Sequence, residues 1–203
     1  MRMPRINTEY RDDARKKIFA AALDLAMENG WDAITLDAIA QNVGVTKPAL
    51  YSYFDNLDAL LLEVNLEVAR NIQAGLKTTF AQNNDIHDII RSLADLIFEQ
   101  QKPYANIIFQ LPTRLRQDPK HREEFACLFD DSRIIIRDGL ARVKSRGNLL
   151  DAVDPDAVTC MIIAMTLGLQ TNSDFLDMDV AAAKKIWIDA VERLLMIVPG
   201  NGQ

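Results

Sequence analysis

The 203-residue chain contains few of the residues that break regular structure or cross-link a protein. It has eight glycines, seven prolines, two cysteines and two histidines. So few glycines and prolines leave little sequence for long loops, which favours helices joined by short turns. Cys127 and Cys160 are isolated and lack metal-ligand spacing. Neither a disulfide framework nor a metal site is therefore expected.

The chain also lacks an apolar run long enough to cross a membrane. The longest uncharged stretch, residues 157–173, contains threonine, glutamine and asparagine and is shorter than the ~20 apolar residues of a spanning helix. The N-terminal sequence MRMPRINTEYRDDARKK is charged and has no apolar core of a secretory signal. We therefore expect a cytoplasmic protein without membrane contact, in which residues 155–172 form a buried helix.

An excess of positive charge is missing as well. The net charge is −6 and the isoelectric point is near 5.0, which taken alone argues against a nucleic-acid partner. The charge is uneven, however: residues 1–20 carry six basic and three acidic side chains, so six minus three gives +3. Because phosphate contacts are local, a basic N-terminal arm that includes Arg5 is compatible with DNA binding. The alternative is a solvated terminus without a binding role.

What the sequence does contain is helical periodicity along almost its whole length. Ala14, Ile18 and Ala22 line one face of a first helix that ends near Gly30, and two short helices follow within residues 35–54. Longer helices are predicted over residues 57–80, 85–100, 119–146, 155–172 and 179–197, with a short one between Pro103 and Pro112. This pattern predicts an all-α fold of about nine helices. It divides near residue 55, into an N-terminal domain over residues 1–55 and a larger helical domain over residues 56–203.

The stretch TLDAIAQNVGVTKPALYSYF, residues 35–54, predicts two short helices joined by a tight turn. Thr35 is placed to cap the first helix, Thr46 is placed to cap the second, and Gly44 permits a left-handed turn between them. The outer face of the second helix is short and polar, with Thr46, Lys47, Ala49, Ser52 and Tyr53. A small polar face of this kind suits a helix that enters the DNA major groove, so the pattern is typical of a helix-turn-helix motif.

With the sequence that follows it, DNLDALL, this motif resembles the DNA-binding domain of the TetR family of bacterial transcriptional regulators. The likeness covers residues 12–72. It rests on Gly30, Thr35, Ile39, Ala40, Gly44, Val45, Leu50, Tyr51, Phe54 and Leu60, which fall at the family's spacings. The resemblance implies a ligand-responsive regulator, usually a repressor, that binds a near-palindromic operator as a dimer. The candidate DNA-binding residues are Arg5, Thr35, Thr46, Lys47, Ala49, Tyr51, Ser52 and Tyr53, of which the family places Thr35 and Tyr51 on phosphates.

The chain departs from the family at three positions of this motif. Pro48 stands where a glycine or another small residue is usual, and Tyr53 stands where histidine is common. Leu57 replaces the lysine that usually opens the fourth helix and holds a phosphate. Loss of one such cation is expected to make the dependence of DNA affinity on salt shallower by about one unit of log–log slope.

The resemblance also implies that the last two helices pair with their copies in a second subunit. Residues 155–172 are apolar on nearly all sides, and a helix of this kind needs partners on every side, which a homodimer supplies. The expected interface residues are Ile162, Leu167, Gly168, Trp187, Val191 and Leu194. The alternative is that these helices only close the core of the monomer.

An apolar pocket for a small-molecule effector is the last expectation from the family pattern. Its candidate lining combines aromatic, aliphatic and methionine side chains with one amide: Phe98, Tyr104, Ile107, Ile108, Phe109, Met161, Met165 and Gln170. For each of these residues an ordinary place in the core is the alternative.

Two other classes of function compete with a regulator. An enzyme on a helical scaffold is not expected, because the sequence has no Glu-x-x-His motif, no glycine-rich phosphate loop and no serine in a nucleophile elbow. No cofactor is expected either. A helical ligand-binding or scaffold protein with weakened DNA binding is the second alternative, and the sparse positive charge around residues 44–60 motivates it.

Overall fold

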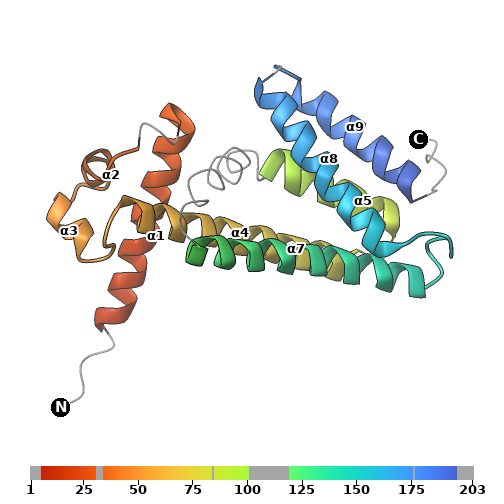
Figure 1. The fold of residues 1–203 in the computed structure, drawn as a ribbon, viewed down its shortest axis with the longest axis horizontal. Helices are drawn as coiled ribbons and strands as arrows, with labels where there is room; N and C mark the ends of the chain where they lie inside the picture. Colours follow the sequence, from red (N-terminus) through yellow and green to blue (C-terminus); the bar gives the residue numbers. More distant parts are fainter. Residues whose placement is uncertain (1–5, 31–33, 84, 101–118, 176, 196–203) are drawn as a thin grey trace, which may run out of the picture. The chain divides into compact units, whose positions relative to one another are not determined.

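The computed structural model describes residues 6–30, 34–83, 85–100, 119–175 and 177–195 (Figure 1). Within these ranges the chain forms eight α-helices and one π-helical turn and no strand, which confirms the all-α prediction. None of the described helices is long and apolar enough to traverse a bilayer. Both cysteines are free and exposed. The short helix predicted between Pro103 and Pro112 lies outside the described residues.

The helices fall into two compact units. The first unit, Met1–Val68, holds α1 (Ile6–Asn29), α2 (Leu36–Val43), α3 (Lys47–Tyr51) and the first turns of α4 (Leu57–Gln82). The second unit, Ala69–Gln203, holds the rest of α4, then α5 (Ile86–Asp95), the π-helical turn η2 (Leu96–Gln100), α7 (Pro119–Ser145), α8 (Pro155–Phe175) and α9 (Val180–Leu194).

The division between the units falls inside α4, whereas the sequence pattern placed a boundary at residue 55, before this helix begins. The first turns of α4 carry Leu60 and Val64, which are fully buried. They are also tied to α1 by an ion pair in which Arg15 Nη2 lies 2.6 Å from Glu63 Oε1. A change from one unit to the next within a continuous helix leaves no mark in the apolar period, which is why the pattern did not locate it.

The ends of α2 are fixed by the local signals that the sequence predicted. Thr35 is the N-cap, and its Oγ1 accepts a hydrogen bond of 3.1 Å from the backbone N–H of Ala38. Gly44 ends the helix with a φ of 77°, a left-handed conformation that side chains other than glycine rarely adopt. The backbone N–H of Val45 then donates to the Ala40 carbonyl at 2.9 Å, which closes the turn into α3.

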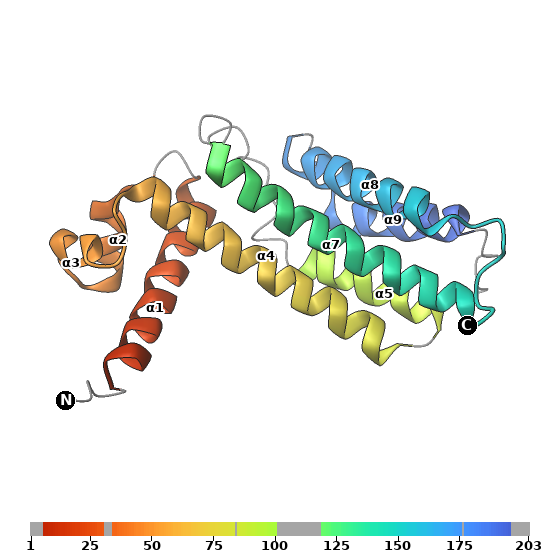
Figure 2. The same cartoon turned by 60° about the horizontal axis from the view of Figure 1, so that its bottom comes forward.

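The core of the second unit centres on Trp187 of α9, which is fully buried. Its Nε1 donates to Thr166 Oγ1 at 2.9 Å, and its ring meets Phe98 edge-on with centroids 6.3 Å apart. Thr166 in turn donates to the carbonyl of Ile162 at 2.8 Å. Helices α8 and α9 lie side by side; α9 also packs against α5 and η2, whereas α8 packs against α7 (Figure 2).

This core contradicts half of the predicted dimer interface. Ile162, Trp187 and Val191 are 2%, 0% and 1% exposed, so a single chain already buries them and they offer no surface to a partner. The other predicted positions remain partly or fully exposed, namely Leu167, Gly168 and Leu194. For Ile162 the error has a physical cause: α8 is apolar on nearly all sides, so no polar residue marks which side faces the core of its own chain.

The predicted helix over residues 85–100 is α-helical only as far as Asp95 and continues as η2. Around this turn, Gln170 of α8 donates to the carbonyl of Ile97 at 3.5 Å. Lys184 of α9 forms ion pairs with Asp95, at 2.5 Å, and with Glu99. The hydrogen bond that Lys184 donates to Asp95 is the largest cause of a Lys184 pKa above the ordinary lysine value. Polar contacts from α8 and α9 thus hold this turn in place.

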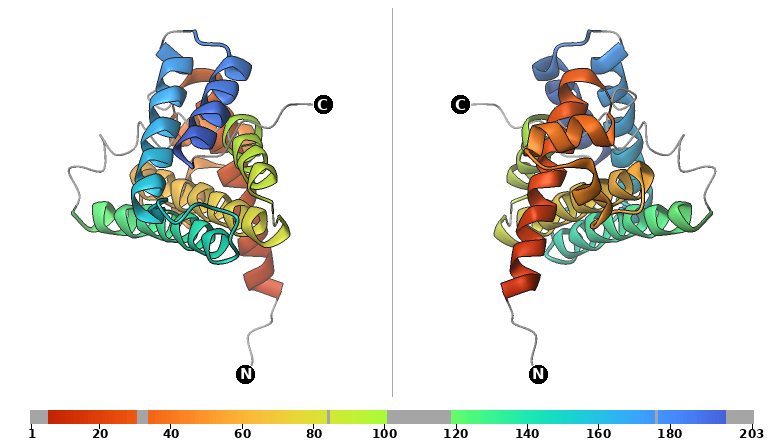
Figure 3. Two further views of the ribbon diagram at one scale, coloured as in Figure 1. Left: turned by 90° about the vertical axis from the view of Figure 1, so that its right-hand side faces the viewer. Right: turned by 90° about the vertical axis from the view of Figure 1, so that its left-hand side faces the viewer.

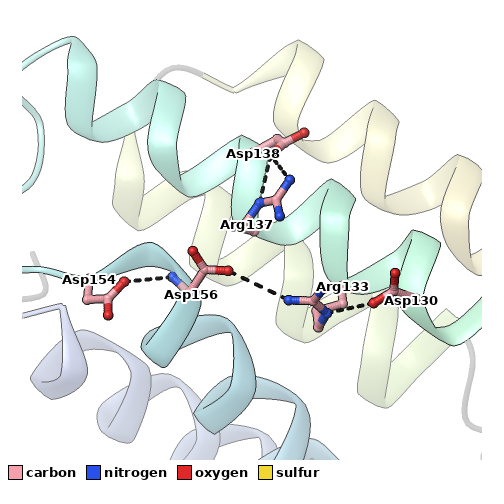
Figure 4. A network of polar contacts seen from close by, with 6 residues as sticks. All are labelled: Asp130, Arg133, Arg137, Asp138, Asp154 and Asp156. Carbon is pink, nitrogen blue, oxygen red and sulfur yellow. Dashed lines mark hydrogen bonds and ion pairs between the residues drawn. The ribbon is translucent and has the colours of Figure 1, made fainter.

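A polar network joins α7 to the start of α8 (Figure 4). Asp154 accepts a 3.0 Å hydrogen bond from the backbone N–H of Asp156, in the first turn of α8. The carboxylate of Asp156 lies 3.6 Å from Arg133 of α7, and Arg133 donates to Asp130 at 2.8 Å. Because these side chains are solvent-accessible, the network contributes little to stability and mainly orients the two helix ends.

Two helical glycines at close contacts give a test of this packing. A Cβ at Gly139 would lie 2.5 Å from the Phe80 ring, whereas a Cβ at Gly75 would lie 2.6 Å from the terminal methyl of Leu96. Gly139→Ala is expected to lower the free energy of unfolding by about 1–3 kcal/mol, because a rigid ring must move. Gly75→Ala should cost less, because a leucine tip can change rotamer. Urea unfolding followed by circular dichroism at one protein concentration measures both; an equal loss in the two variants would contradict the tight packing of Phe80.

Candidate nucleic-acid interface

Helix α3 presents a short polar surface next to the turn that precedes it. Thr46, Tyr51 and Ser52 are exposed, and the Tyr51 side chain retains 50% of its accessible surface. Thr46 is the N-cap residue of α3, but its side chain makes no capping hydrogen bond. The opposite side of the helix carries Leu50, which is 1% exposed. A helix anchored by one apolar face, with small polar groups outward, has the form required to approach base edges.

Lys47 is the one cation of this helix, and an ion pair holds it. Its Nζ lies 2.7 Å from Oδ2 of Asp37, in the first turn of α2. The hydrogen bond to Asp37 raises the pKa of Lys47 above its ordinary value. The surrounding sequence is acidic: residues 34–69 contain one basic and five acidic side chains, so one minus five gives −4. The motif itself therefore supplies little attraction for phosphate.

Helix α1 supplies the remaining basic side chains of the described part of this unit. Arg15 makes two hydrogen bonds to Glu63, at 2.6 and 2.7 Å, and its guanidinium lies 5.3 Å from the centroid of the Phe54 ring. Lys16 and Lys17 are exposed on the surface of α1. Arg15 is therefore occupied by contacts within the unit, and Lys16 Nζ lies 3.9 Å from Asp13 Oδ1, whereas no ion pair of Lys17 is found among the described residues.

Arg11, which the sequence analysis did not single out, lies beside the end of α3. Its guanidinium carbon is 5.6 Å from the centroid of the Tyr53 ring, and its Nη2 donates to the Ser52 carbonyl at 3.2 Å. The one sequence signal for it is the four-residue spacing from Arg15, which puts both arginines on the same face of α1. The right-hand view of Figure 3 faces the side of the molecule that carries α3.

The predicted DNA-binding residues that the structure describes are gathered around α2 and α3. Lys47, Ala49 and Tyr53 are half-buried, and Thr35 is exposed at the start of α2. Ser52 Oγ donates to the Ala49 carbonyl at 2.6 Å, so its hydroxyl is already engaged. Arg5 lies outside the described residues.

The predicted pocket residues are not brought together by the described part of the chain. Phe98 is 3% exposed and packs inside the core, whereas Met161 is 49% exposed on the outer side of α8. Met161 and Met165 line a groove of about 630 Å³ between α8 and α9, together with Ala164, Ile186, Asp189, Ala190, Arg193 and Leu194. Tyr104, Ile107, Ile108 and Phe109 lie outside the described residues. The structure thus places the two methionines in a groove with residues of α9, away from the buried Phe98.

Comparison with known proteins agrees with the geometry of the first unit. Residues 18–64 match the family model described as bacterial regulatory proteins, tetR family. The HTH-type transcriptional regulator YdeS of Bacillus subtilis is 29% identical over 131 residues, which is 64% of each chain. The transcriptional activator FasR of Mycolicibacterium smegmatis is 28% identical over 44% of this chain and 41% of its own. The chain thus spans less than two thirds of the length of either relative.

Other relatives match over more of the chain. The transcriptional repressor Rv1474c of Mycobacterium tuberculosis is 22% identical over 82% of this chain and 86% of its own. Among solved structures, the regulator FadR of Bacillus subtilis in complex with stearoyl-CoA superposes with a TM-score of 0.71, over 87% of this chain and 96% of its own, at 18% identity. At so low an identity, the superposition shows a common fold and nothing more. With the capped helix pair, the outward polar face of α3 and the matched residues 18–64, the first unit carries a DNA-binding domain of the kind found in the tetR family of bacterial regulatory proteins.

Proposed function

We propose that this protein is a ligand-responsive transcriptional repressor that binds a near-palindromic DNA operator as a homodimer. The observation that carries the proposal is the outer face of α3, where Thr46 and the half-exposed Tyr51 lie opposite the buried Leu50. In this arrangement α3 enters the major groove, and the N-terminus of α2 with the Thr35 hydroxyl faces the phosphate backbone.

A homodimer is proposed because one five-residue helix contacts too few bases to select a site in a genome. Two copies of α3, held about 34 Å apart, read two half-sites one helical turn apart. The groove between α8 and α9 is the surface we assign to the second copy. Its floor is apolar, with Met161 and Ile186 49% and 48% exposed, and it also carries Asp189 and Arg193. A two-fold axis brings acidic and basic residues of this kind from the two copies opposite one another.

An effector that is largely apolar is proposed to bind within the second unit. Two of the predicted pocket residues lie at the same turn: Phe98 is buried in η2, and the amide of Gln170 donates to the η2 carbonyl of Ile97. The stearoyl-CoA complex of a protein with this fold supports an apolar effector. A ligand that binds one dimer spacing better by ~1–3 kcal/mol would change operator affinity ~5–150-fold. Repression, rather than activation, is proposed in analogy with the repressor relative.

Selection of genomic fragments with the purified protein tests the proposal as a whole. We expect the selected fragments to share a short near-palindrome. Affinity for that sequence should exceed affinity for random duplex by about 10³-fold or more at physiological salt. Fluorescence anisotropy at two salt concentrations measures both. Weak binding that is equal on all duplexes would support the alternative of a helical ligand-binding protein with a weakened DNA motif.

The ion pair between Lys47 and Asp37 generates a second prediction. Lys47→Gln should weaken operator binding only modestly and reduce the salt slope by less than one, because the cation that it removes is already paired with Asp37. Asp37→Asn should act in the opposite direction, because it frees Lys47 and removes a negative charge from the motif. Asp151→Asn, on the loop between α7 and α8, is the control for net charge. If Asp37→Asn and Asp151→Asn changed affinity alike, the ion pair would have no part in binding.

The groove between α8 and α9 generates a third. The double substitution Met161→Glu and Ile186→Glu should convert the dimer to a monomer in analytical ultracentrifugation and weaken operator binding, because it places charge in an apolar interface. Leu150→Glu is the matched control, since Leu150 is 54% exposed but lies on the loop after α7. An intact dimer in the double variant would show that the second copy binds elsewhere.

A further inference from the structure

The proposed DNA-binding surface has too little positive charge to account for binding to phosphate. Residues 34–69 carry a net charge of one minus five, or −4, and their single cation, Lys47, is paired with Asp37. Leu57 stands where the family resemblance expects a phosphate-binding lysine. DNA affinity depends strongly on cations placed against phosphates, so a side chain from another part of the unit must supply the contact. The only other basic residues before α2 that the structure describes lie on α1.

Two arginines of α1 contact two consecutive aromatic residues after α3. Arg15 lies against Phe54, with 5.3 Å from guanidinium carbon to ring centroid, and Arg11 lies against Tyr53, at 5.6 Å. The four-residue spacing places both arginines on one face of α1. The earlier arginine, Arg11, contacts the earlier aromatic residue, Tyr53, and Arg15 contacts the next one, Phe54. The two pairs form a double arginine–aromatic contact between α1 and the segment that follows α3.

The two arginines of this double contact differ in their other polar partners. Arg15 is closed off by Glu63, which accepts two hydrogen bonds from its Nη2. Arg11 makes no ion pair with any carboxylate among the described side chains. Its one hydrogen bond is to the Ser52 carbonyl, and it is exposed. A guanidinium has five N–H donors, so most of those of Arg11 remain available to an anion.

The location of Arg11 is fixed by the chain around it. Ser52 and Tyr53 directly follow α3, and Tyr51, the last residue of the helix, is 50% exposed. When a helix lies in the major groove, the residues at its ends come nearest to the phosphates that border the groove. The cation–π contact with the Tyr53 ring holds the guanidinium there and lowers the entropy lost when it binds an anion.

We propose that Arg11 binds an operator phosphate at the C-terminal end of α3, and that Tyr53 is the residue that positions it. Arg11 would then supply the charge that Leu57 does not. The proposal rests on the proposed function, because it requires α3 to lie in the groove. It assigns Tyr53 a role through Arg11 in addition to any base contact of its own.

The test compares charge and ring variants in the full-length protein on one selected duplex and one random duplex. Arg11→Gln should weaken binding to both about tenfold, as for loss of a charge-assisted hydrogen bond, and lower the salt slope by about one. Arg11→Lys should restore the slope, because the slope follows the charge. Lys17→Gln is the control, since Lys17 is an exposed cation on a different face of α1; it should leave the slope unchanged.

Tyr53 is tested by a matched pair. Tyr53→Phe retains the ring and should keep the wild-type salt slope, whereas Tyr53→Leu should lower it. The double variant with Tyr53→Leu and Arg11→Gln should have the same salt slope as Arg11→Gln alone, because both substitutions remove the same contact, that of Arg11 with the phosphate. Thermal unfolding by circular dichroism verifies that each variant is folded. If Arg11→Gln does not fold, the proposal is tested by the other two variants: Arg11→Lys should keep the wild-type salt slope, and Tyr53→Leu should lower it.

The outcomes separate the two proposals. Wild-type protein that binds no duplex in a salt-dependent manner would overturn the proposed function itself. Wild-type protein that binds its operator, while Arg11→Gln changes the slope no more than Lys17→Gln does, would overturn the role of Arg11 alone. An unchanged slope in Tyr53→Leu, with a lowered slope in Arg11→Gln, would overturn the positioning role of Tyr53.

Discussion

The polar surface of α3 depends on how this very short helix is held in place. Helix α3 has five residues, too few to be stable in isolation, because helix nucleation costs more than one turn of hydrogen bonds returns. Leu50 and Phe54 are 1% and 3% exposed, and the Phe54 ring lies 5.8 Å from that of Phe19 on α1. Burial of these two side chains fixes the rotation of α3, so the polar side of the helix must point outward. Without them there would be no defined surface to present to DNA.

In the same unit, the surface proposed to contact DNA bases and the cations proposed to contact phosphates lie on different helices. The turn and the two short helices have one lysine, which is paired with Asp37, whereas the exposed Arg11 and Lys17 lie on α1. In the complex with DNA that we propose, such a division lets α3 contact base edges without strong binding to any phosphate backbone, and leaves affinity to side chains beside the helix. Specificity is a difference between affinities, and a low non-specific affinity raises it.

Local signals were predictable from the sequence, and contacts distant along the chain were not. The Thr35 cap and the Gly44 turn depend on neighbours within a few residues, and both were found as predicted. Arg11 was missed because the Ser52 carbonyl that holds it lies 41 positions away. In α8 the sequence predicted burial but not direction: Ile162 faces the core and Met161 faces outward, and both are apolar. The turn η2 was missed because apolar spacing continues through it.

The most direct measurement of the central claim is chemical protection of the selected operator by the bound protein. Dimethyl sulfate methylates guanine N7, which lies in the major groove, so it reports whether a helix occupies that groove. The account predicts protected guanines in two patches about one helical turn apart, with the protection lost when Leu50→Ala releases α3 from its anchor. Unprotected N7 positions in a footprinted operator would contradict it, because α3 would then lie outside the major groove.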